Sequence, residues 1–274
     1  MRYAFLLFSI FLFSPAIAQQ NDPDTIRDAE IAKGTNIIAA AWLVGETQRY
    51  PHYVRGTSFE AEGLRVRTDE GAILTLWLDE DHVFEDRTPR LADLDNDGRD
   101  EISLVLTSVH AGSALAIYTV EGEKIVKKAQ TPFIGTAFRW LNPAGIADFN
   151  GDGQKDIAFV AMPHLVKRLE FWTFTDGKLR QIANANGYSN HRNGSPHTGM
   201  SAIADFNGDG VDDLALPDAD RRSVRILGFD AGKLVERMDL SLGAAADGNF
   251  NLSGKLGRWV LRIPTDTGVA TLRF

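Results

Sequence analysis

Oxygen-bearing side chains recur at one fixed spacing in three short segments of the chain. The segments are ADLDNDGRDEISLV (92–105), ADFNGDGQKDIAFV (147–160) and ADFNGDGVDDLALP (204–217). Counted from the first aspartate, an oxygen donor occupies positions 1, 3, 5 and 9 of each segment, and glycine occupies position 6. Ca²⁺ prefers six to eight hard oxygen ligands in flexible geometry. Each segment therefore has the donor set of a calcium-binding loop that glycine allows to curl tightly.

The predicted ligands of each loop are four side chains and one backbone carbonyl, which comes from position 7 and does not depend on the side chain there. They are Asp93, Asp95, Asp97, Arg99 and Glu101 in the first loop, Asp148, Asn150, Asp152, Gln154 and Asp156 in the second, and Asp205, Asn207, Asp209, Val211 and Asp213 in the third. Because Glu101 is longer than the aspartate of the other two loops, we expect the first site to differ in geometry. We expect up to three Ca²⁺ ions with a structural role, bound at about 0.1–1 mM as in other extracellular modules.

Two other interpretations of these loops are weaker. An EF-hand loop ends with a bidentate glutamate at position 12 and lies between helices, but position 12 here is Leu104, Phe159 or Leu216, inside an apolar run. Asp, Asn and Gly also favour plain turns, but the carboxylates crowded into three such loops would repel one another without a cation. Adjacent residues of an extended chain face opposite ways, so we expect Asp100 and Asp212, at position 8, to point outward.

The loops recur at the period of a structural unit, because their first aspartates lie 55 and 57 residues apart. Each loop follows a short apolar segment and precedes three strand-like segments with glycine-bearing turns, which is typical of antiparallel strands. A repeated four-stranded unit of about 50 residues is typical of a β-propeller blade, since one blade cannot bury both of its faces alone. The predicted fold class is all-β, a β-propeller of four-stranded antiparallel blades. About five blades are expected, with four or six left open.

The blades are assigned to a single domain, residues 19–274. The clear repeats span about 90–135, 145–185 and 202–242, and degenerate blades are expected at about 36–86 and 244–274. The last set holds about three strands, so we expect an N-terminal segment to complete it and close the ring. Helical periodicity is confined to residues 23–33.

The three units resemble FG-GAP or VCBS-type repeats, which are the blade modules of integrin α-chain-like β-propellers. The resemblance is specific over roughly residues 90–240 and is carried by the acidic loops and the blade plan. The Phe-Gly and Gly-Ala-Pro signatures of integrin-type blades are not evident. The resemblance implies a calcium-binding propeller that serves as an interaction module.

The N-terminus predicts export. Arg2 precedes an apolar run, 4–13, and the small residues of Ala16–Ala18 fit a signal-peptidase site, so residues 1–18 read as a signal peptide. The run is shorter than the roughly 20 residues of a membrane span, and no later segment is long enough. The protein is therefore expected in the periplasm or outside the cell. It has no cysteine and a net charge of −8, which excludes disulfide stabilisation and disfavours nucleic-acid binding.

Basic and histidine-bearing loops are predicted on the face opposite the acidic loops, where strands two and three and successive blades are joined. The candidate ligand-binding residues are Arg139, Trp140, His164, His191, Arg192 and His197. Trp140 and Tyr188 could stack on a sugar ring. Against this interpretation, charged residues are common in any surface loop.

No nucleophile elbow, zinc-protease motif or phosphate loop is present, so the sequence favours a binding module over an enzyme. The predicted partner of this monomer is a protein or a glycan. A polysaccharide lyase or hydrolase with residues converging at the channel mouth is one alternative, and a structural component of the cell envelope is another.

Overall fold

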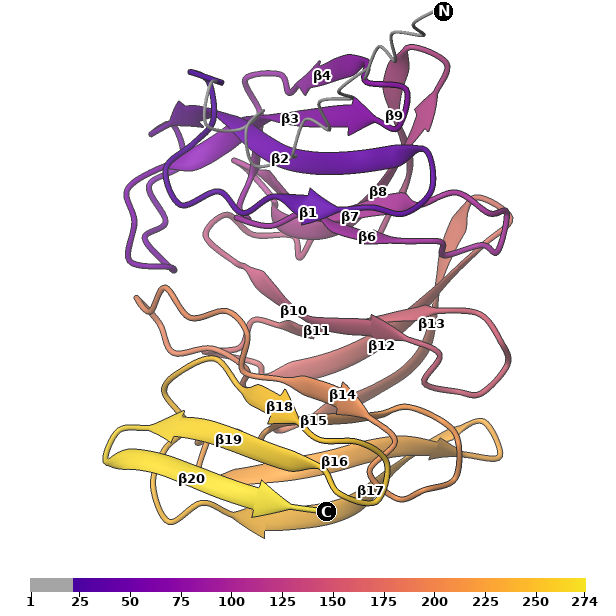
Figure 1. Ribbon diagram of the computed structural model, residues 1–274. Helices are drawn as coiled ribbons and strands as arrows, with labels where there is room; N and C mark the ends of the chain where they lie inside the picture. The colour runs from indigo at the N-terminus through magenta and orange to yellow at the C-terminus, as the bar shows by residue number, and fades with distance from the viewer. Residues whose placement is uncertain (1–21) are drawn as a thin grey trace, which may run out of the picture.

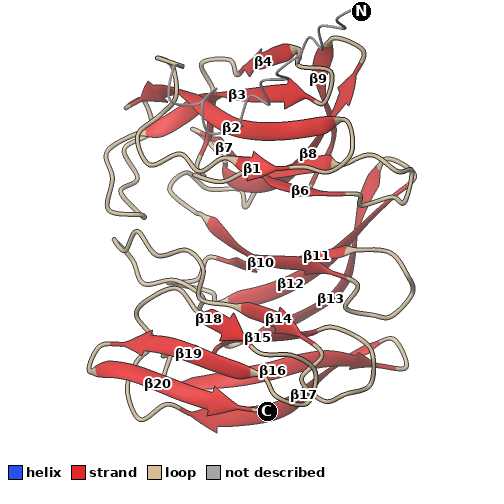
Figure 2. Ribbon diagram, in the orientation of Figure 1, coloured by secondary structure: helices blue, strands red, loops and turns tan. Residues whose placement is uncertain are grey.

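The computed structural model describes residues 22–274, so the predicted signal peptide lies outside the described residues. The described chain forms twenty β-strands and no helix (Figure 2). Accordingly, it contains no helix long and apolar enough to cross a bilayer. The predicted all-β class with four-stranded antiparallel sheets is confirmed, and residues 23–33, despite their helical periodicity, form two turns, an isolated bridge and β1.

The first nine strands form one sheet. They are β1 (Ala32–Lys33), β2 (Ile38–Thr47), β3 (Glu60–Thr68), β4 (Ile73–Trp77), β5 (His82–Phe84), β6 (Arg90–Ala92), β7 (Glu101–Ser108), β8 (Gly112–Glu121) and β9 (Lys124–Gln130). The sheet consists of two units, and within the described residues their only strand pairing joins Ala61 of β3 to Phe84 of β5. In the second unit β5 and β6 together line one edge of β7, so this unit has a broken first strand.

The remaining strands form three separate sheets. They are β10 (Leu141–Ala147), β11 (Asp156–Ala161), β12 (Arg168–Thr175) and β13 (Lys178–Asn186); β14 (Ala202–Ala204), β15 (Asp213–Pro217), β16 (Ser223–Asp230) and β17 (Lys233–Ser241); and β18 (Asn251–Ser253), β19 (Val260–Thr265) and β20 (Gly268–Arg273). All pairings are antiparallel between consecutive strands. The five units match the expected number of blades.

The second strand of each repeat is buried on both faces, because neighbouring sheets cover it from both sides. Every residue of β7, β11 and β15 is buried. Adjacent residues of β7 point into different cores: Leu104 packs with the first unit and Val105 packs with β10–β13. Such strands must be continuously apolar, whereas along the outer strands β13 and β17 exposed residues are interspersed with partly buried ones. Face-to-face packing of this kind is what a propeller blade requires.

Two expectations for the ends of the chain are wrong. The segment 82–86 was expected in the first blade, but β5 pairs chiefly with β7, and β1 supplies the fourth strand of the first unit by pairing with β2. No described strand joins the free edge of β20. Figure 1 shows β1–β4 in the upper part of the view, and β14–β17 and β18–β20 together in its lower part. The N-terminal strand therefore does not complete the last sheet.

Candidate functional site

The three acidic loops join the first and second strands of successive units: β6 to β7, β10 to β11, and β14 to β15. The glycine at position 6 has a left-handed backbone in all three, with φ of 86°, 88° and 86°, which glycine adopts without steric cost. Its N–H donates to the carboxylate at position 1. The bonds measure 3.1, 2.8 and 2.9 Å in the pairs Gly98–Asp93, Gly153–Asp148 and Gly210–Asp205. The three loops that share a sequence pattern thus also share one backbone turn and one hydrogen bond.

Three carboxylates of the first loop converge on one point. Oxygens of Asp93, Asp95 and Glu101 lie within 4.8 Å of one another. One oxygen of Asp93, Oδ1, is buried without a hydrogen-bond partner among the described residues. Burial, together with the charges of Asp95 and Asp97, raises the pKa of Glu101 to about 7. A cation would supply the missing partner and offset the repulsion, so these residues fit Ca²⁺.

The second loop places an unsatisfied carboxylate deeper still. Asp156 is fully buried, and neither of its oxygens forms a hydrogen bond of good geometry within residues 22–274, although Thr173 and the backbone of Phe149 lie close enough to favour its charged form. Burial, followed by the charges of Asp152 and Asp148, raises the pKa of Asp156 to about 7. An unpaired carboxylate is costly to bury. The residues of this loop also fit a bound cation.

The third loop differs because it contains a cation of its own. The guanidinium of Arg237, from β17, donates to Asp213 Oδ1 at 2.8 Å and to Asp209 Oδ2 at 3.0 Å. Both carboxylates are predicted calcium ligands. Asp213 is 1% exposed; burial raises its pKa, and the hydrogen bond and charge of Arg237 oppose that rise. Here the arginine and Ca²⁺ would compete for the same oxygens.

The loops are tied to one another across unit boundaries. Asn96 of the first loop donates to the carbonyl of Gly153 at 3.1 Å, and Gln154 of the second donates through Nε2 to the carbonyl of Leu94 at 2.9 Å. Trp259, in the last unit, donates to the carbonyl of Asp205 at 2.9 Å. These contacts therefore couple the conformation of each loop to the position of the neighbouring sheet.

Asp100 does not point into solvent as expected. Its Oδ2 accepts hydrogen bonds from the N–H groups of Thr35 at 2.8 Å and Asn36 at 3.1 Å, and the residue is buried. The side chain does face away from the loop, but the first unit occupies that side. Asp100 thus holds β1–β4 against the second unit.

Comparison with known proteins agrees with this geometry. A family model described as FG-GAP-like repeat matches residues 93–159 and 148–216. Residues 93–216 are thus similar to FG-GAP-like repeats. Each match starts at the first aspartate of one acidic loop and extends past the next, so the family pattern includes the first and second strands around each loop. A search of the curated proteins found no match.

A cavity of about 190 Å³ lies at the end of the FG-GAP-like repeats opposite the acidic loops. It is lined by His52, Phe138, Arg139, Trp140, Met162, His164, Leu165 and Asn193. The segment before β10 and the loop between β11 and β12 supply most of this lining, and antiparallel strands place both at the end away from the β10–β11 loop. Figure 2 shows loops gathered at two opposite edges of the sheets. Three predicted ligand-binding residues, Arg139, Trp140 and His164, therefore meet at one cavity.

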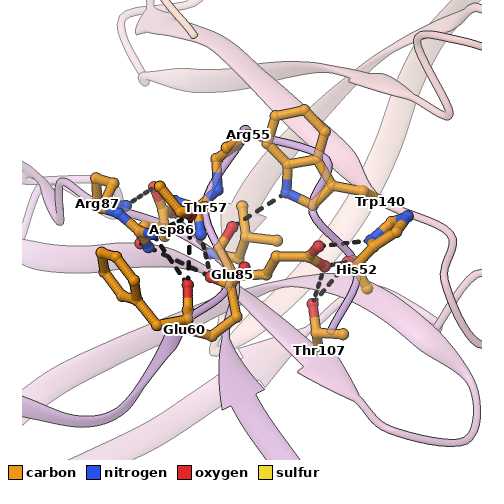
Figure 3. A network of polar contacts seen from close by, with 12 residues as sticks. His52, Arg55, Thr57, Glu60, Glu85, Asp86, Arg87, Thr107 and Trp140 are labelled. Carbon is orange, nitrogen blue, oxygen red and sulfur yellow. Dashed lines mark hydrogen bonds and ion pairs between the residues drawn. The ribbon is translucent and has the colours of Figure 1, made fainter. Parts of the chain in front are cut away.

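A buried network of polar contacts, which no local sequence pattern predicted, lies behind the cavity (Figure 3). The carboxylate of Glu85, which is fully buried, lies 2.6 Å from Nδ1 of His52 and accepts a hydrogen bond from Thr107 at 3.0 Å. The indole N–H of Trp140 donates to the backbone carbonyl of Glu85 at 3.0 Å. These residues are 22–55 positions apart, so no local motif could reveal them.

His191 lies behind the cavity wall. Its Nδ1 is 2.8 Å from Nε2 of His164, and its own Nε2 is 2.9 Å from the carbonyl oxygen of Ser195. Burial lowers the pKa of His164 to about 4, with Arg221 and His52 adding to the effect. Burial, followed by the charge of His164, lowers the pKa of His191 to about 3. Both imidazoles are therefore neutral at pH 7.

Residues around the cavity are held in strained backbone conformations. Tyr53, Phe138 and Met162 have φ of 56°, 56° and 48°, a left-handed region that non-glycine residues rarely occupy. Tyr53, Phe138 and the neighbouring Leu165 are nevertheless 55%, 44% and 62% exposed. Such strain persists where the surrounding structure enforces it, and it is concentrated at ligand sites.

The remaining sequence candidates do not line the cavity. Arg192 forms an ion pair with Asp247, and His197 is exposed outside the lining. The rings of Trp140 and Tyr188 are 3% and 5% exposed, so neither offers the open face expected for stacking. Trp140 instead forms part of the cavity wall.

Proposed function

We propose that the protein is an exported, calcium-stabilised interaction module that presents the face opposite its acidic loops to a protein or carbohydrate-like partner. The supporting observation is a buried carboxylate oxygen without a hydrogen-bond partner in each of the first two loops, Oδ1 of Asp93 and the oxygens of Asp156. A protein keeps such groups when a cation completes them. The predicted signal peptide supports export. Export also suits loops that bind Ca²⁺ with low affinity, since such loops need the Ca²⁺ concentrations found outside the cell.

Calcium has a structural role in this proposal. The loops lie at the edges where neighbouring units meet, and the contacts of Asn96 and Gln154 cross those edges. A bound ion would fix the loop and, through these contacts, the orientation of adjacent sheets. The opposite face then presents its cavity on a rigid support, which lowers the conformational entropy lost on binding.

The cavity favours binding over catalysis. The apolar side chains of Phe138, Met162 and Leu165 form much of its lining, and exposed apolar groups around a cavity mark interaction sites. The one observation that favours the lyase or hydrolase alternative is the contact of His52 with Glu85, since a carboxylate that orients an imidazole is also found beside general bases.

The direct test is a binding screen of the calcium-loaded protein against a glycan and anionic-ligand array. We expect saturable binding that is lost in Phe138→Ala/Leu165→Ala and retained in Lys233→Ala, a control in the β16–β17 turn on the acidic-loop side. An array without any saturable binder would favour the structural-component alternative. Turnover of a bound polysaccharide would favour the enzyme alternative.

A further inference from the structure

Two imidazoles of the cavity are fixed in defined tautomers by groups behind them. The carbonyl oxygen of Ser195 can only accept, so Nε2 of His191 carries a proton and donates to it at 2.9 Å. Neutral His191 then has an unprotonated Nδ1, which accepts from Nε2–H of His164 at 2.8 Å. Nδ1 of neutral His164 is left unprotonated, and it has no hydrogen-bond partner among residues 22–274. His164 therefore offers an acceptor, not a donor.

The same reasoning applies to His52. Its Nδ1 lies 2.6 Å from Glu85 Oε1, and a carboxylate accepts, so Nδ1 carries the proton. Nε2 has no partner in the described part of the chain, and Figure 3 shows it directed away from Glu85. Both His52 and His164 line the cavity. The cavity thus holds a nitrogen lone pair on His164 Nδ1 that requires a donor from the ligand, and beside it the outward-facing Nε2 of His52.

A metal ion and a hydroxyl group could both occupy such lone pairs, and the surrounding charges decide between them. Arg139 lines the cavity, and the charges of Arg221 and Lys167 reach His164 strongly enough to lower its pKa. The carboxylate beside His52, Glu85, is engaged by it, and Glu60 in the same network is paired with Arg55 and Arg87. Positive surroundings disfavour a cation and favour an anion.

We propose that the cavity binds a hydroxycarboxylic acid of sugar-acid type, with one hydroxyl group donating to His164 Nδ1, a second hydroxyl group hydrogen-bonded to His52 Nε2, and the carboxylate facing Arg139. The cavity volume of about 190 Å³ equals that of about six water molecules at roughly 30 Å³ each. The cavity therefore has room for a single sugar ring and not for a chain of sugars. The exposed ring of Phe138 at the rim would contact the apolar face of that ring. This inference rests on the proposed function, because it names the ligand of the same face.

The experiment uses the mature, calcium-loaded protein and isothermal titration with four probes: D-glucuronate, D-glucose, cyclohexanecarboxylate and Zn²⁺. We expect saturable 1:1 binding of glucuronate. Glucose lacks the carboxylate and cyclohexanecarboxylate lacks the hydroxyls, so each should bind at least about tenfold more weakly, the loss expected for one charged or two neutral hydrogen bonds. Absence of glucuronate binding, equal binding of either analogue, or preferential binding of Zn²⁺ overturns the proposal.

Variants test the named residues. Arg139→Met and His164→Phe should each weaken glucuronate binding at least about tenfold, whereas Arg192→Ala, outside the cavity, should leave it unchanged. Unaltered affinity in His164→Phe overturns the assignment. If these variants fold poorly, the tautomers remain testable by NMR of the ring nitrogens in the wild-type protein. Protonation of His164 at Nδ1 at pH 7.5 would also overturn it.

The two proposals can fail separately. The ligand assignment alone is contradicted if glucuronate does not bind while calcium still stabilises the protein and binding on the array is unchanged in His164→Phe. A protein whose stability and array binding do not depend on calcium contradicts the proposed function.

Discussion

Arg237 and Asp213 form the ion pair that distinguishes the third acidic loop from the other two. Nε of Arg237 donates to Oδ1 of Asp213 at 2.8 Å, and the guanidinium also reaches Asp209. Asp156, the counterpart of Asp213 in the second loop, has no such partner among the described residues. One repeat thus carries an internal cation where another has an unpaired carboxylate.

Arg237→Met should convert the third loop into a calcium-dependent one. Removing one partner of a largely buried pair costs about 3 kcal/mol, so we expect that loss of unfolding free energy in chelator and a smaller loss in 10 mM Ca²⁺, where the ion replaces the guanidinium. Chemical denaturation in the two buffers measures both. An equal loss in both buffers would show that Arg237 does not compete with Ca²⁺.

Gly228→Ala should break the same ion pair sterically. The backbone of Gly228 is not left-handed, but an added Cβ would overlap with Asp213 Oδ1 and Arg237 Nε. We expect a loss of about 1–3 kcal/mol, as for other overpacked sites. In the Arg237→Met background the loss should shrink, because one of the two clashing groups is gone. Additive losses in this double-mutant cycle would argue against the steric mechanism.

Asp156→Asn should remove the calcium response of the second loop. The amide keeps the shape of the carboxylate and lacks its charge, so the variant loses one site's share of calcium stabilisation, about 2.7 kcal/mol at a Ca²⁺ concentration of 100 times Kd. In chelator the variant should be at least as stable as the wild type, because wild-type Asp156 is then a buried carboxyl group without a cation, whose pKa is raised to about 7. Asp176→Asn, in the exposed turn after β12, is the control and should respond to calcium like the wild type.

Acid should destabilise the protein through His164. Its folded-state pKa, about 4, lies below the ordinary value near 6.5, so the unfolded chain binds more protons between these values. Stability is therefore fully present above pH 6.5 and falls as the pH drops toward 4. His164→Phe should have a shallower loss over this window than the wild type, with both measured in Ca²⁺ to hold the loop carboxylates ionised. Parallel profiles would contradict the low pKa.

Local patterns predicted the repeats correctly. The ligand types of the acidic loops lie within nine residues of one another, and the apolar runs that follow are buried on both faces, so spacing and hydrophobicity were enough to place the loops and the strands after them. The direction of antiparallel strands was enough to bring Arg139 and His164 to the opposite face.

Contacts between distant segments could not be predicted. Arg237 lies 24 residues from Asp213, and its approach depends on Gly228 across the β15–β16–β17 pairing. His52 reaches Glu85 through a loop of the degenerate first unit, whose pattern is too weak to align. The sequence predicts Trp140 in an exposed loop, but its indole is buried because its N–H donates to the backbone carbonyl of Glu85. Similarly, β5 was assigned to the first unit because chain order does not reveal which sheet edge is open.

Calcium binding by the acidic loops is the central claim, and thermal unfolding of the wild-type protein in 10 mM Ca²⁺ and in excess chelator tests it most directly. With Kd near 0.1 mM, each of the first two loops should contribute about 2.7 kcal/mol of calcium-dependent stability. We therefore expect a clear rise of Tm in Ca²⁺, and none of similar size in Mg²⁺, which tolerates such flexible loops poorly. Melting temperatures that agree within error in Ca²⁺ and chelator would contradict the account.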